Sequence, residues 1–102
     1  MSRKEQIEAL LVENPEDSFL RYGLAMEHAS AGDDAGAVRV FRDLLARDAD
    51  YVPAYLQAGQ ALIRQGEDDK AKEILKNGIA VAQRKGDDHA AGEMAGLLQA
   101  VE

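Results

Sequence analysis

The chain lacks cysteine and threonine entirely and contains only two prolines in 102 residues. Without cysteine it can form no disulfide and no thiolate metal site, and it has no cysteine nucleophile. This composition is typical of a reducing compartment, and we expect a cytoplasmic protein. The shortage of threonine and aromatic residues disfavours strands, whereas the many Ala, Leu, Glu, Arg and Asp residues favour helices. One all-α domain with a single modest core is therefore expected.

Long apolar stretches are also missing. The N-terminal segment lacks the apolar core of a signal peptide, and no apolar run approaches the roughly 20 residues that a membrane-spanning helix needs. We expect no membrane segment. The formal net charge of −7 repels phosphate groups, so neither nucleic acid nor an anionic membrane is an expected partner. Solubility, a preference for basic peptides and a salt-rich cytoplasm all explain the acidic excess, and the sequence leaves these alternatives open.

Motifs for catalysis and for cofactors are absent as well. The chain contains neither a G-x-x-x-x-G-K-[ST] phosphate-binding loop nor a G-x-S-x-G nucleophile motif, so we expect no enzyme and no cofactor. His28 and His89 fall on different predicted helices, away from any cluster of metal-binding residues. We interpret His28 as a core or boundary histidine and His89 as a surface residue in a first helical turn. The three Asp pairs lack the alternating spacing of a calcium loop, and helix capping explains them without a metal.

Apolar residues recur with the spacing of six amphipathic helices. We predict helices over residues 2–13, 15–30, 34–47, 52–64, 68–84 and 88–101. Ser2 and Glu5 form a capping box for the first helix. Asn14 is expected to cap the second helix and Pro15 to occupy its first position.

Glycines are predicted to end three of these helices. Gly32 and Gly66 follow the second and fourth helices, and Gly86 follows the fifth. We expect a positive φ at Gly32, since such a conformation costs glycine little. The pair Asn77–Gly78 is a turn signal, but the apolar stripe continues through it. We therefore predict an unbroken fifth helix with a soft spot at Gly78 that costs about 1 kcal/mol.

The strongest regularity in the chain is a fixed period. The turn and the helix after it recur, so that Gly32, Ala37, Phe41 and Leu45 correspond to Gly66, Ala71, Leu75 and Ile79, with the same offset in every pair. A fixed period of about 34 residues is typical of helical repeat arrays. It favours a module for binding or assembly.

On these residues the chain resembles the tetratricopeptide repeat family, whose unit is a pair of antiparallel helices. The family places a small residue midway along the first helix of each unit, and Ala25 and Gly59 stand there in this chain. Tyr55 stands where the family prefers tryptophan. The resemblance covers most of the chain and keeps its register until about Gly86. It implies a right-handed superhelical array of antiparallel helix pairs.

The resemblance also divides the single domain, residues 1–102, into four parts. It implies an N-terminal half-repeat helix at 1–17, one repeat at 18–51, a second repeat at 52–85 and a capping helix at 86–102. The last helix departs from the family pattern, because Glu93 lies one full period beyond Gly59 and is not small. We interpret this helix as a cap that covers the end of the array.

In this family the first helix of each unit lines a concave groove that holds a peptide or a helix. By register, the resemblance implies a partner-binding groove lined by Phe19, Tyr22, Met26, Ala29, Leu56, Gln60, Ile63 and Arg64. The polar residues with which some members grip a chaperone's terminal carboxylate are replaced here by Tyr22, Met26 and Leu56, so no carboxylate clamp is expected.

The expected function is a non-catalytic adaptor or scaffold that binds a peptide or helix of a protein partner in this apolar groove. The alternative is a structural module that forms a homodimer through the same groove. A third possibility is that the last helix covers these residues.

Overall fold

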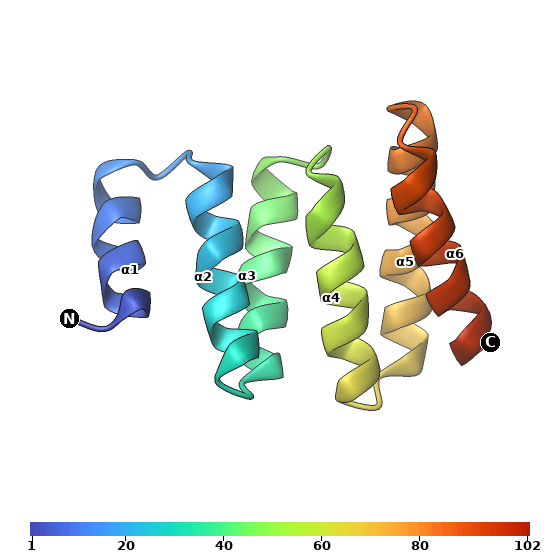
Figure 1. Cartoon of the computed structure of the whole chain (residues 1–102), viewed down its shortest axis with the longest axis horizontal. Helices are drawn as coiled ribbons and strands as arrows, with labels where there is room; N and C mark the ends of the chain where they lie inside the picture. Colours follow the sequence, from blue (N-terminus) through green and yellow to red (C-terminus); the bar gives the residue numbers. More distant parts are fainter.

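The computed structural model describes all residues from Met1 to Glu102 and contains six helices. They are α1 (Arg3–Glu13), α2 (Ser18–Ser30), α3 (Asp34–Arg47), α4 (Val52–Arg64), α5 (Asp68–Arg84) and α6 (Asp88–Val101). Successive helices run antiparallel and pack side by side, and the molecule measures 40 × 29 × 19 Å (Figure 1). The expected all-α fold is confirmed. No helix combines the length and the apolar character needed to cross a membrane.

The helices alternate between two sides of the molecule. In the view of Figure 1, α2, α4 and α6 lie toward the reader, with α3 and α5 behind them. The last helix packs on α5 and also contacts α4, so it continues the row of front helices instead of lying across it. The last helix thus closes the end of the array beside α4, which it contacts, and does not lie over α2.

The three predicted glycine turns are present. Gly32, Gly66 and Gly86 have φ values of 81°, 77° and 74°, and no residue other than glycine has a positive φ. In each turn the amide of the residue after the glycine donates to a carbonyl of the preceding helix, as Asp33 does to His28 at 2.9 Å. Positive φ at these turns is the reason why glycine recurs there.

The start of the second helix differs from the prediction. Asn14 ends α1 instead of capping α2, since its side-chain Nδ2 donates to the Leu10 carbonyl at 3.0 Å. Asp17 is the N-cap of α2 and accepts a hydrogen bond from the Leu20 amide at 3.0 Å. Pro15 therefore lies in the connection, before the helix begins at Ser18. Asn and Asp both cap helices well, and only the packed structure selects between them.

Small residues allow the helices to approach closely, as the repeat pattern predicts. Ala25, Ala37 and Ala71 are completely buried. A Cβ atom on Gly59 would lie 2.6 Å from the Cδ2 atom of Leu75 on the next helix. These positions place the large core side chains in the gaps between helices.

Gly78 has a packing role in the middle of α5. A Cβ atom there would lie 2.5 Å from the Cβ of Tyr55 and 2.6 Å from the sulfur of Met94. The predicted unbroken helix is confirmed. The loss of helix propensity at Gly78 therefore accompanies a close contact with both α4 and α6.

Candidate functional site

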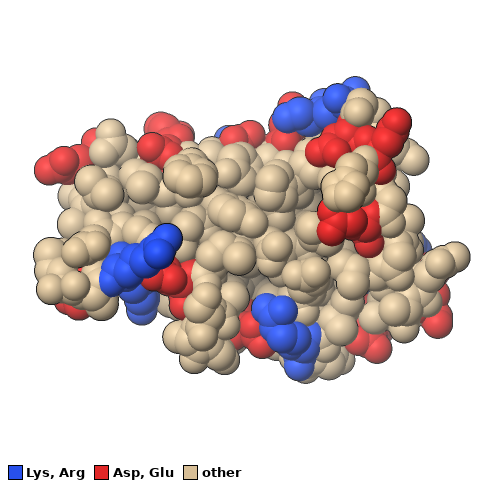
Figure 2. All heavy atoms as spheres, viewed as in Figure 1, with Lys and Arg blue, Asp and Glu red and all other residues tan.

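The front face is our name for the side of the molecule formed by α2, α4 and α6. Figure 2 shows that uncharged atoms cover most of its middle, whereas charged side chains gather toward its edges and over α6. Charged residues make up 30% of the chain, so they are distributed unevenly over the surface, with few of them in the middle of this face. A weakly charged, partly apolar surface of this kind is suited to contact with another protein.

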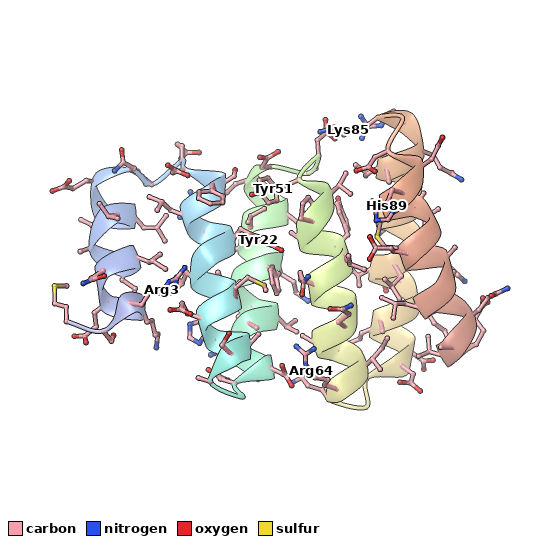
Figure 3. All side chains as sticks on the ribbon, in the orientation of Figure 1. Arg3, Tyr22, Tyr51, Arg64, Lys85 and His89 are labelled. Carbon is pink, nitrogen blue, oxygen red and sulfur yellow. The ribbon has the colours of Figure 1, made fainter.

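The predicted groove residues of α2 differ in their exposure. Phe19 is 73% exposed, whereas Tyr22 and Met26 are half-buried against the core. The Tyr22 ring lies 5.9 Å from the Phe41 ring and 5.5 Å from the Tyr51 ring, both in tilted geometry. Tyr22, labelled in Figure 3, therefore both faces the front and supports the core.

The predicted residues of α4 are half-buried, with one exception. Leu56, Gln60 and Ile63 each keep part of their side chain accessible. Arg64 is exposed, and its Nε and Nη2 atoms lie 3.0 and 2.9 Å from the Asp34 carboxylate at the start of α3. The Arg64 guanidinium, predicted to line the groove, thus ties α4 to α3 at the edge of the face (Figure 3).

The tyrosines of this region remain neutral at physiological pH. Burial raises the pKa of the Tyr22 phenol, the neighbouring Tyr51 adds to the increase, and a Gln57 hydrogen bond opposes it. Burial likewise raises the pKa of Tyr51, followed by the charges of Asp48 and Asp17. Because the ordinary value is already 10.0, neither phenol adds a negative charge to the front face.

The cavities of the molecule lie elsewhere. One of about 380 Å³ is formed at α1 by Met1, Gln6, Ala9, Leu10 and Glu13. Two smaller ones, of about 230 and 280 Å³, lie between α3 and α5 and have α4 residues in their lining. None of the three is lined by a predicted groove residue, so the front face is a shallow surface. The sequence analysis did not identify the cavity that Arg39 and Arg42 share.

The two histidines occupy the places that the sequence indicates. His28 has 15% of its side chain exposed, and its Nδ1 lies 2.9 Å from the Asp33 carboxylate. His89, at the start of α6, is 89% exposed and lies 3.0 Å from Glu93. The Gly36 amide, followed by His28, lowers the pKa of Asp33, which also caps α3. The interpretation of His28 as a boundary histidine and of His89 as a surface residue is confirmed.

Large exposed hydrophobic residues are confined to the N-terminal end. Met1, Leu10, Val12 and Phe19 are 81%, 47%, 82% and 73% exposed, respectively. Three of them belong to α1 or precede it, and α1 packs mainly on α2. The last belongs to the first turn of α2 and is the most accessible apolar residue of the predicted groove.

Comparison with known proteins identifies what the chain is similar to. Residues 28–95 match the family model of the tetratricopeptide repeat. A TPR repeat-containing protein of Pseudomonas aeruginosa is 26% identical over 98 residues, which are 96% of this chain and 93% of that protein.

Solved structures of tetratricopeptide repeat proteins and of other proteins are also similar to this chain over most of its length. The tetratricopeptide repeat domain protein of Salinibacter ruber is 33% identical over 86% of this chain and 89% of its own, with a TM-score of 0.81. PcrH, solved in complex with the chaperone binding region of PopD, is 19% identical, and the match covers 96% of this chain and 74% of that one with a TM-score of 0.89. At that identity the likeness to PcrH concerns the fold alone.

Proposed function

Because the chain belongs to the tetratricopeptide repeat family, whose members are in general non-catalytic binding modules, we propose that it binds a segment of a partner protein on its front face. Phe19, Tyr22, Met26, Leu56, Gln60, Ile63 and Arg64 are the proposed contacts. The partner segment is a peptide or a helix that lies across α2 and α4. The division of the chain into a half-repeat, two repeats and a capping helix belongs to the same proposal.

One observation carries this proposal. The middle of the front face is largely uncharged, and apolar side chains remain half-exposed on two successive front helices. These side chains also pack against the core, and the apolar part that they leave exposed would be favourably removed from water by a partner. PcrH, which has the same fold, binds a region of PopD, and this supports a peptide ligand without identifying one.

The experiment must avoid residues that also support the core. Tyr22 contacts Phe41 and Tyr51, so its replacement would combine a loss of binding with a loss of stability. We would instead introduce a photo-crosslinking amino acid at position 60, on the front face, and at position 73, an exposed position of α5, as the matched control. Both proteins would be irradiated in the native cell.

We expect a discrete heterologous adduct from position 60 that is absent from position 73. Adducts of equal yield from both positions, or none from position 60, would contradict the proposal. An adduct of the chain with itself would support the alternative, in which the front face forms a homodimer. Sedimentation of the purified protein separates these cases, because the alternative requires a dimer whose population grows with concentration.

A further inference from the structure

Two neighbouring cavities lie between α3 and α5, on the side opposite the front face. We call them together the back trough. The first, of about 230 Å³, has three basic side chains in its lining, Arg39, Arg42 and Lys70, and a single acidic one, Glu67. The second, of about 280 Å³, is lined by Arg42, Leu45, Ala46, Tyr55, Ile74 and Asn77. Arg42 lines both, so a basic compartment adjoins a mainly uncharged one.

The basic compartment is unusual for this molecule. The chain carries 19 acidic residues and 12 Lys and Arg residues, and most of its arginines pair with a carboxylate. Arg39, Arg42 and Lys70 take part in none of the ion pairs of the structure. The lining holds three bases and one acid, and the Arg39 charge also helps to lower the pKa of the nearby Asp33, so the lining itself is net positive in a protein whose net charge is −7. A group of opposite charge would be attracted to this point and repelled by most of the remaining surface.

We propose that the back trough binds an acidic segment of a partner protein. A carboxylate of that segment lies among Arg39, Arg42 and Lys70, where charge-assisted hydrogen bonds hold it. An apolar side chain of the same segment enters the second compartment, over Leu45 and Ile74. The net negative charge of the protein disfavours a long polyanion such as nucleic acid, so a short segment with few charges fits the trough better.

The geometry also sets the spacing within the ligand. Arg39 and Leu45 are six residues apart on α3, and Lys70 and Asn77 are seven apart on α5. At about 1.5 Å of rise per helical residue, the two compartments are separated by roughly 9–10 Å along the helices. A peptide in the polyproline II conformation advances about 3.1 Å per residue with three residues per turn, so two side chains three residues apart project from the same side at about this separation. The sequence pattern of the ligand is Glu-x-x-Leu.

The test is an NMR titration of the full chain with a synthetic peptide, acetyl-Glu-Glu-Ser-Gly-Leu-amide. Two further peptides serve as controls, one with Gln in place of both Glu residues and one with Ser in place of Leu. Inorganic phosphate is titrated as a fourth probe. Each titration is repeated with Arg42→Glu, and with Lys76→Glu as the matched variant, because Lys76 is an exposed base on α5 that does not line the trough.

We expect the acidic peptide to shift the amide signals of residues 35–46 and 65–77 and to leave those of the front face in place. The Gln and Ser peptides should bind more weakly, and Arg42→Glu should reduce affinity about tenfold or more, because it replaces a charge-assisted hydrogen bond with repulsion between like charges. Lys76→Glu should keep most of the affinity. Amide spectra of the free variants show directly whether each remains folded.

Three results would overturn the proposal. Equal losses in Arg42→Glu and Lys76→Glu would show only general attraction to surface bases. Binding of phosphate as tight as that of the peptide would leave the apolar compartment without a role. Shifts confined to the front face would place the ligand there instead. The back trough is separate from the front face, so this test stands whether or not the front face binds a partner.

Discussion

The chain leaves α3 and α5 in different ways, although these helices occupy equivalent places in the repeat period. After α3, Asp48 ends the helix, its amide donates to Leu44 at 2.8 Å, and Tyr51 donates back to the Asp48 carbonyl at 3.2 Å. The connection after α1, which lies one period earlier, has the same two hydrogen bonds, with Asn14 in the place of Asp48 and Asp17 in the place of Tyr51.

After α5 this connection is absent. Ala82 stands one period after Asp48 and remains helical and completely buried. The helix continues to Arg84, and the chain reverses at Gly86 through the same kind of turn that joins α2 to α3 and α4 to α5. The Asp87 amide donates to the Ala82 carbonyl at 2.8 Å in this turn.

The difference shows how one residue type sets the end of a helix. Asn and Asp compete with the helix for backbone hydrogen bonds and stop it, whereas Ala has the highest helix propensity and lets it continue. The longer α5 delays the start of α6, so that Met94 packs against Gly78 while Glu93 faces outward. The register is therefore lost at Ala82, one helical turn earlier than the predicted limit at Gly86.

The largest effect should come from breaking the contact that attaches α6. Met94 is completely buried, so Met94→Ala removes side-chain volume from the core and should cost about 2–5 kcal/mol. The matched variant Glu93→Ala should change stability by less than about 0.5 kcal/mol, as surface substitutions do. Urea unfolding measures both. Equal effects of the two variants would refute the register that we assign to α6.

The next effect concerns the close approach at Gly78. Alanine would improve helix propensity there, but its Cβ would meet Tyr55 and Met94 at about the 2.5–2.6 Å given by the structure. The clash should dominate, and Gly78→Ala should cost about 1–3 kcal/mol. Gly96→Ala, where a Cβ meets nothing within 4 Å, should stabilise the protein by about 0.5–1 kcal/mol. Thermal melts that show a gain for both variants would contradict the crossing at Gly78.

A third prediction distinguishes the two kinds of connection. Gly86→Ala forces a side chain into positive φ and should cost about 1–2 kcal/mol, and Gly66→Ala should cost a similar amount. Ala49→Gly, in the connection without positive φ, should have a smaller effect that arises mainly from the flexibility of the unfolded chain. Denaturant midpoints compare the three. A much smaller loss for Gly86→Ala than for Gly66→Ala would show that the turns are not alike.

The smallest effect concerns an ion pair between the end of α5 and the connection from α3 to α4. Arg84 Nη2 lies 2.7 Å from the Asp50 carboxylate, and Lys85, labelled in Figure 3, donates to the Asp50 carbonyl at 3.2 Å. The Arg84 hydrogen bond and charge lower the pKa of Asp50 below its ordinary value of 3.8. The pair therefore stabilises the folded state at pH values above 3.8, and this contribution is lost as the pH falls through the lowered pKa.

Arg84→Gln should thus lower the melting temperature slightly at neutral pH and have no effect in strong acid. Both side chains are exposed, so the change at neutral pH should be small. Lys76→Gln is the control on the same helix. A difference between Arg84→Gln and the parent that persists unchanged into strong acid would show that Asp50 is not the partner that matters.

The sequence by itself determined the local features of the fold. Apolar spacing predicted six helices because it reports which face of each helix is buried. Gly32, Gly66 and Gly86 predicted turns because positive φ is a property of a single residue. The capping box of Ser2 and Glu5 is present for the same reason, since both of its hydrogen bonds, at 3.1 Å, join residues three apart.

Only the tertiary structure decided which residues meet across helices. It brings Arg64 to Asp34, which keeps this arginine at the edge of the front face, and it places Lys70 beside Arg39 and Arg42. These residues are far apart in the chain, and no local spacing relates them. Such contacts depend on the relative rotation and shift of packed helices, which the interlocking of many side chains sets together. A delay of a few residues at Ala82 is therefore enough to change which face of α6 is buried.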